Sequence, residues 1–132
     1  MFIKAGTKYS PHDETQRTSM NHSSYIRFLN CIDALEAKGG VTKLDAIETQ
    51  LLDWIMMTFS QGGEILVGDL LVLSHIGSQA TLHGRLQKLI TLGYVKQALD
   101  SVDGRKKKIL PTKLAIKRYE ILSKLLEKSI SA

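Results

Sequence analysis

The chain has 132 residues, of which 43% are hydrophobic, a length and composition typical of one compact domain with its own core. A single cysteine excludes an internal disulfide framework and a zinc site made of cysteines alone. The longest uncharged apolar stretches are too short to cross a bilayer, and the first residues lack the apolar run of a signal peptide. We therefore expect a cytoplasmic protein with no membrane partner.

The net charge of +5 is unevenly distributed along the chain. Residues 1–77 carry six basic and nine acidic side chains, whereas residues 78–118 carry ten basic and two acidic ones, a local net charge of +8. A block of this sign favours a polyanionic partner, although a solvated basic face would have the same composition. Charge alone leaves both interpretations open, and the residues within the block must decide between them.

The first part of the chain predicts an arm followed by two helices. Residues 1–20 show no periodic apolar face, and we expect them to form a flexible N-terminal arm. Apolar side chains then recur at spacings of three and four over residues 23–37, which predicts a first helix. A second helix is expected over residues 43–59, with Thr42 as its N-cap and Asp45 completing a loose capping box.

Two features of these helices allow more than one interpretation. Cys31 lies at the edge of the first apolar face, where a buried thiol is expected and a redox-sensing thiol is the alternative. Trp54, Met56 and Met57 lie off the apolar stripe of the second helix. Core or subunit contacts are expected for them, and the lining of a ligand pocket is the alternative.

A helix-turn-helix is expected next in the chain. A short apolar helix over residues 67–74 is followed by the turn His75-Ile76-Gly77, and a further helix begins after the N-cap Ser78 and ends at Gly93. Two helices joined by a three-residue turn that contains glycine form this motif. The sequence therefore predicts a helix-turn-helix over residues 65–93.

A basic β-hairpin follows directly. Residues 94–99 and 105–110 are expected to be extended, and Asp103-Gly104 between them is typical of a hairpin turn. Thr112 is placed to cap a last helix over residues 113–128. This order of elements indicates a hairpin wing attached to the helix-turn-helix.

The predicted fold class is mainly α with a small β-hairpin wing. We expect a single winged helix-turn-helix domain over residues 21–132, with the wing over residues 94–111 and flanking helices over residues 22–38 and 112–130. The first of these terminal helices has one apolar face and the last has two. We therefore expect the terminal helices to pair subunits.

The helix that begins after Ser78 has the strongest functional pattern. Its leucines lie on one side, and the opposite side carries small and polar residues, among them Gly84. Glycine in a helix interior is less stable than alanine by about 1 kcal/mol. Gly84 would let the backbone approach base edges closely, or it is merely tolerated on a solvated face. The major groove of a duplex admits one such helix.

Roles at a duplex can be assigned residue by residue. Ser78 and Gln79 lie at the helix N-terminus, where backbone N–H groups favour phosphate. Thr81 and His83 are placed to reach base edges, and Arg85 to bind guanine or clamp a phosphate. Further cations on this helix and in the hairpin would contact phosphates. The candidate DNA-binding residues are Ser78, Gln79, Thr81, His83, Gly84, Arg85, Lys88, Arg105, Lys106 and Lys107.

Patterns that carry catalysis are missing from the sequence. The histidines form neither an H-E-x-x-H motif nor a paired spacing with cysteine, and no glycine-rich phosphate loop is present. The acidic pair Asp13-Glu14 lies in the expected arm, a poor place for acid–base chemistry. We therefore expect no enzyme, no cofactor and no metal site.

Four stretches between Ile65 and Thr112 share a pattern with a known family. They are Val67-Gly68-Asp69-Leu70-Leu71, Ser78-Gln79-Ala80-Thr81-Leu82, Leu89-Ile90-Thr91-Leu92-Gly93-Tyr94-Val95 and Asp103-Gly104-Arg105-Lys106. Through them the chain resembles the winged helix-turn-helix core of MarR-type transcription regulators. The resemblance implies a homodimer on a palindromic operator, with a recognition helix over residues 78–92 and Arg105 in the minor groove.

The expected function is sequence-specific binding of double-stranded DNA by a dimeric transcription regulator. Repression by blocking a promoter is favoured, and activation remains open. Whether a small-molecule effector binds is also open. The alternative is a winged-helix module for protein–protein interaction that binds no DNA.

Overall fold

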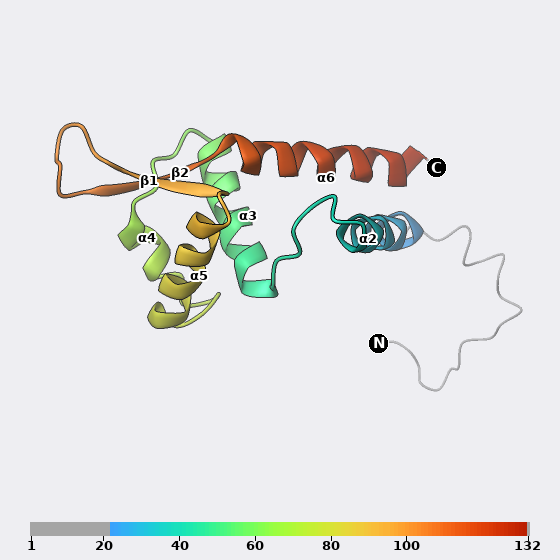
Figure 1. The fold of residues 1–132 in the computed structure, drawn as a ribbon, viewed down its shortest axis with the longest axis horizontal. Helices are drawn as coiled ribbons and strands as arrows, with labels where there is room; N and C mark the ends of the chain where they lie inside the picture. The colour runs from blue at the N-terminus through green and yellow to red at the C-terminus, as the bar shows by residue number, and fades with distance from the viewer. Residues whose placement is uncertain (1–21, 132) are drawn as a thin grey trace, which may run out of the picture. The chain divides into compact units, whose positions relative to one another are not determined.

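The computed structural model describes residues 22–131 and is mainly helical, with one antiparallel hairpin (Figure 1). The predicted arm over residues 1–20 lies outside the described residues. The elements in chain order are α2 (His22–Ala37), α3 (Ala46–Ser60), α4 (Val67–Leu71), α5 (Gln79–Thr91), β1 (Val95–Leu99), β2 (Lys107–Pro111) and α6 (Lys113–Ser131).

The chain divides into two compact units. One unit spans Val41–Ile121 and contains the expected helix-turn-helix and hairpin. The other combines residues 22–40 with residues 122–131, and so contains α2 and the end of α6. Within the second unit, the Arg27 guanidinium donates two hydrogen bonds to the Ser129 carbonyl oxygen, at 3.1 and 2.8 Å.

The core of the Val41–Ile121 unit lies between α3 and α5. Leucines at spacings of four and three put one face of α5 against α3, where all of them are fully buried. Burial of such side chains is the main stabilising contribution to a domain of this size. The fully buried leucines and isoleucine of the two helices are Leu51, Leu52, Ile55, Leu82, Leu86 and Leu89.

Helix α3 begins three residues later than predicted, because a different capping box forms. Asp45 is the N-cap, and its carboxylate accepts the Glu48 N–H at 2.7 Å. The Glu48 carboxylate accepts the Asp45 N–H at 2.9 Å in return. This pair satisfies two free helix donors, as Glu at the third helical position allows. The prediction that Thr42 caps this helix was wrong.

Helix α4 ends at Leu71 rather than at Ser74 as predicted. Beyond it, three backbone N–H groups bond carbonyls two or three residues back: Leu73 to Leu70, Ser74 to Val72 and Ile76 to Leu73. These short bonds form tight turns in place of a further helical turn. The link between the two helices of the motif is therefore longer than the predicted three residues.

Both ends of α5 agree with the predicted signals. Ser78 is the N-cap, and its Oγ accepts the Thr81 N–H at 3.2 Å. Gly93 adopts φ +87° and its N–H bonds the Ile90 carbonyl, while the Tyr94 N–H bonds that of Leu89. Glycine adopts this left-handed conformation without steric strain, so it ends the helix and turns the chain into β1.

Strands β1 and β2 form the predicted hairpin, with Val95 paired to Pro111 and Leu99 to Lys107. Figure 1 shows the hairpin loop projecting away from the helices of its unit. The second strand begins at Lys107, so the prediction that it starts at Arg105 was wrong by two residues. The loop is closed by a hydrogen bond from the Asp100 N–H to the Lys106 carbonyl at 2.9 Å.

The other end of the hairpin is anchored on two sides. The Ile109 N–H donates to the Ile65 carbonyl at 2.8 Å, beside an isolated bridge between Leu66 and Lys108. Thr112 acts as the predicted cap of α6, since its Oγ1 accepts the Ala115 N–H at 3.3 Å. The hairpin is thus held between the start of α4 and the start of α6.

A buried arginine joins three segments of the same unit. Arg118 of α6 is only 7% exposed, and its Nη1 donates to the Thr42 carbonyl at 2.7 Å and to the Tyr94 hydroxyl at 3.2 Å. Its guanidinium carbon also lies 5.4 Å from the centre of the Tyr94 ring, within the range of a cation–π contact. No sequence pattern indicates this role of Arg118, because Thr42 and Tyr94 are distant from it in the chain.

Candidate nucleic-acid interface

The outer face of α5 is exposed and free of bulky apolar groups. Lys88 is exposed on this face and His83 at its edge, while Gln79 is exposed in the first turn of α5. Gly84 lies between them, and a Cβ built on it would meet no atom within 4 Å. The face is therefore smooth at Gly84, with space for another molecule to approach the backbone.

Two candidate residues at the start of α5 are engaged with each other. The Ser78 hydroxyl bonds the Thr81 hydroxyl at 2.9 Å in addition to capping the helix. Thr81 is half-buried, so its side chain is less available to a base edge than that of His83. Ser78 and Thr81 thus orient the first turn of α5, and a direct contact with DNA remains a prediction for both.

Arg85 lies at the edge of this face, beside the N-terminus of α3. Its Nε is 2.8 Å from Oδ2 of Asp45 and 3.9 Å from Oε2 of Glu48. The contact is an ion pair without hydrogen-bond direction, since the buried Nε–H has no acceptor in line. The sequence offered no signal for this pairing, because Arg85 is 37 residues from Glu48 in the chain.

The tip of the hairpin carries three exposed cations in succession, Arg105, Lys106 and Lys107. The Arg105 side chain is 93% exposed, and its Nε lies 3.4 Å from the Asp103 carboxylate. That carboxylate also accepts the Arg105 N–H at 3.1 Å, which fixes the turn. Hydrogen bonds within this short loop restrict its backbone, and the three cations project from it into solvent.

Lys108, the last cation of the basic run, is used inside the molecule. Its Nζ lies 3.0 Å from the Glu64 carboxylate and 3.3 Å from that of Asp100. Hydrogen bonds to Glu64 and Asp100 raise the pKa of Lys108 above its usual value. The Asp103 N–H and the Lys108 ammonium hold the pKa of Asp100 below its usual value. The expectation that cations in the hairpin contact phosphates therefore does not extend to Lys108.

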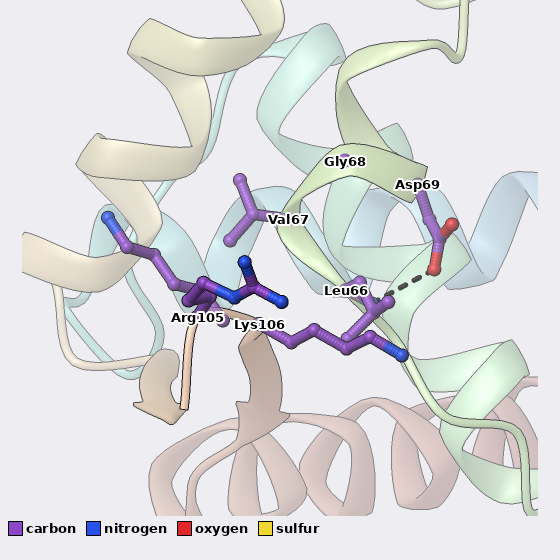
Figure 2. Close-up of a pocket in the computed structure, with 7 residues that line it drawn as sticks. Leu66, Val67, Gly68, Asp69, Arg105 and Lys106 are labelled. Carbon is purple, nitrogen blue, oxygen red and sulfur yellow. Dashed lines mark hydrogen bonds between the residues drawn. The ribbon is translucent and has the colours of Figure 1, made fainter. Parts of the chain in front are cut away.

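A cleft of about 300 Å³ separates the hairpin tip from the start of α4 (Figure 2). The Arg105 guanidinium points toward Val67 and Leu66 there. On the opposite side, the Asp69 carboxylate accepts the Leu66 N–H at 3.0 Å, so it is held by the helix it caps. Three cations face one carboxylate across this cleft, which gives it a net positive charge.

A second hollow, of about 360 Å³, lies against α3 and α6 in the same unit. It is lined in part by Met56 and Met57, for which a ligand pocket was one of two interpretations. The Tyr119 hydroxyl donates a hydrogen bond to the Asp53 carboxylate at the edge of this hollow. Burial raises the pKa of Tyr119 most, and the bond to Asp53 raises it further. Trp54 instead packs against the core.

Within residues 22–131, no group of three metal-ligating side chains lies close enough to hold an ion. No helix in that range has an apolar stretch that would reach across a bilayer. Cys31 is half-buried and forms no disulfide.

The fold resembles that of a transcriptional regulator from Thermotoga maritima, with a TM-score of 0.59 and 18% sequence identity over 92% of this chain and 76% of that chain. A MarR protein from Peptoclostridium difficile is similar over 98% of this chain and 76% of its own, with 23% identity and a TM-score of 0.49. No family model and no curated protein matches the sequence. The first likeness confirms the predicted fold class, a winged helix-turn-helix.

Proposed function

We propose that the protein binds double-stranded DNA sequence-specifically and regulates transcription. The observation that carries this proposal is the pair of surfaces in one compact unit: the smooth outer face of α5 around Gly84 and the exposed cations of the hairpin tip. A helix of this kind fits the major groove, and a basic hairpin beside it would contact the backbone. The fold shared with a transcriptional regulator supports the same function.

We also propose that the protein acts as a dimer. The unit that contains α2 and the end of α6 exposes large apolar side chains, with Tyr25 at 61%, Ile130 at 63% and Leu126 at 43%. Exposed apolar groups gathered on helices are typical of subunit contacts. Two recognition helices related by a two-fold axis would read an operator with two inverted half-sites, and occupancy of such an operator at a promoter would repress transcription.

Selection of duplexes from a random pool, followed by titration across 50 to 300 mM salt, tests this function. We expect enriched duplexes with two inverted half-sites about 10 base pairs apart. The logarithm of the binding constant should fall linearly with the logarithm of salt concentration, by about 0.9 for each phosphate contact. Absence of enrichment together with salt-independent binding would favour the alternative, a protein–protein interaction module.

Gly84→Ala separates stability from binding. Alanine in the middle of α5 should stabilise the free protein by about 0.5–1 kcal/mol, because the added methyl meets no atom within 4 Å. The same methyl would stand between the backbone and the duplex, so we expect affinity to fall about tenfold, or 1.4 kcal/mol. Thermal unfolding and fluorescence anisotropy measure the two effects.

Asn30→Ala is the matched control for this experiment. Asn30 is exposed on α2, so alanine there also raises helix propensity but lies in the other unit. We expect it to raise stability and leave affinity unchanged. Wild-type affinity of Gly84→Ala would mean that the glycine is merely tolerated on a solvated face.

A further inference from the structure

The capping box of α3 has a second role toward α5. Each of its two carboxylates uses one oxygen for the helix and directs the other at Arg85. In Asp45, Oδ1 accepts the Glu48 N–H while Oδ2 lies 2.8 Å from Arg85 Nε. In Glu48, Oε1 accepts the Asp45 N–H while Oε2 lies 3.9 Å from the same atom. The backbone of α3 thus fixes the direction of both negative charges.

Arg85 is the only cation within 4.0 Å of either carboxylate in the part of the chain that the structure describes. Glu48 is only 7% exposed, so solvent screens its charge poorly and a nearby cation is strongly favoured. The Asp45 and Arg85 side chains are 44% and 40% exposed, which leaves the pair open to competition from outside. A phosphate that approaches Arg85 must compete with a carboxylate already in contact, and it also meets repulsion from two negative charges.

We propose that Asp45 and Glu48 attenuate nucleic-acid binding by retaining Arg85 in an ion pair inside the protein. The inference rests on the proposed function and assigns α3 residues a part in setting the affinity of α5. In the wild type, contacts with the duplex then come from the exposed residues of α5 and from the hairpin tip, while Arg85 stays paired with the two carboxylates. Loss of a carboxylate charge releases Arg85 to bind a backbone phosphate.

Asp45→Asn tests the proposal without disturbing the helix. Asparagine is as good an N-cap as aspartate, so the hydrogen bond to the Glu48 N–H and the start of α3 are retained. Glu48→Gln is a second variant of the same kind, because glutamine also completes a capping box. Both variants remove one negative charge and keep the shape of the side chain.

The experiment compares four proteins on one duplex: wild type, Asp45→Asn, Arg85→Gln and the double variant. We expect Asp45→Asn to raise affinity about three- to tenfold at 50 mM salt, and to steepen the salt dependence by about 0.9 as one phosphate contact is added. In the Arg85→Gln background the same change should have a clearly smaller effect. The difference between the two effects measures the coupling through Arg85.

Glu120→Gln is the matched control for general electrostatics. Glu120 is an exposed carboxylate of α6 in the same unit, and no ion pair joins it to any residue from 22 to 131. Its neutralisation should raise affinity less than that of Asp45 does. Equal effects of Asp45→Asn in both backgrounds would overturn the inference, as would a fall in affinity. Failure of the selection to enrich any duplex, with none of the four proteins binding duplex DNA, would overturn the proposed function and the inference with it.

Discussion

Replacement of Arg105, Lys106 and Lys107 together by alanine is expected to weaken duplex binding about 100-fold at 100 mM salt. All three side chains are exposed at the tip of the hairpin, where a phosphate backbone can reach them. The salt dependence of binding should become shallower by about 0.9 for each side chain that contacts a phosphate. Fluorescence anisotropy across a salt series measures both quantities on the same duplex.

The fold of the hairpin should survive this change. The loop is held by backbone bonds, from the Asp100 N–H to the Lys106 carbonyl and from the Lys106 N–H to the Asp103 carbonyl, which alanine retains. The lost contact with Asp103 involves an Arg105 side chain that is 93% exposed, and ion pairs at the surface contribute little to stability. Loss of affinity would therefore report lost contacts with DNA.

Two controls isolate the position of the charge. Alanine at Lys38, Lys124 and Lys128 removes three exposed cations from the other unit, and should change affinity much less. Lys108→Ala removes a cation that is already paired with two carboxylates, so the salt dependence should stay as in the wild type. Equal losses from the hairpin triple and from the control triple would exclude a specific role of the hairpin.

The extent to which sequence predicts this fold depends on the range of the interactions. Local signals were sufficient for α5, where Ser78 and Gly93 lie within one turn of the groups they cap. They failed at the start of α3, because two capping boxes were compatible with the sequence and only Asp45 with Glu48 forms both hydrogen bonds. The end of α4 was missed because nothing in the apolar run marks the point where tight turns replace helix.

The charge of the candidate interface was overestimated from sequence for a related reason. Counting gave ten basic side chains in residues 78–118, but three of them are occupied within the protein: Arg85 by Asp45, Lys108 by Glu64, and Arg118 by a carbonyl and a hydroxyl. Each partner is distant in the chain, so no spacing rule reveals it. The cations that remain exposed are Lys88, Lys96, Arg105, Lys106, Lys107, Lys113 and Lys117.

Among the ten basic side chains of residues 78–118, Arg118 has the largest expected effect on stability. Arg118→Leu keeps an apolar side chain of moderate size in the site but leaves the Thr42 carbonyl and the Tyr94 hydroxyl without their donor. The Tyr94 hydroxyl is buried, and a buried polar group left without a partner costs about 1–3 kcal/mol; the cation–π contact is lost as well. We expect the free energy of unfolding to fall by about 2–4 kcal/mol and Tm by roughly 10 °C.

Lys117→Leu provides the comparison, because it removes the same charge from the neighbouring exposed position on α6. Its effect on stability should stay within about 0.5 kcal/mol, as for most surface changes. The loss of stability caused by Arg118→Lys should fall between those of the two leucine variants. An ammonium keeps the charge but lacks the planar guanidinium that reaches two acceptors and stacks on a ring. Equal unfolding temperatures for Arg118→Leu and Lys117→Leu would mean that Arg118 does not hold α6 to the start of β1. A large difference would show that one arginine of the basic block stabilises the unit that presents the hairpin, while its neighbours remain free to meet a phosphate backbone.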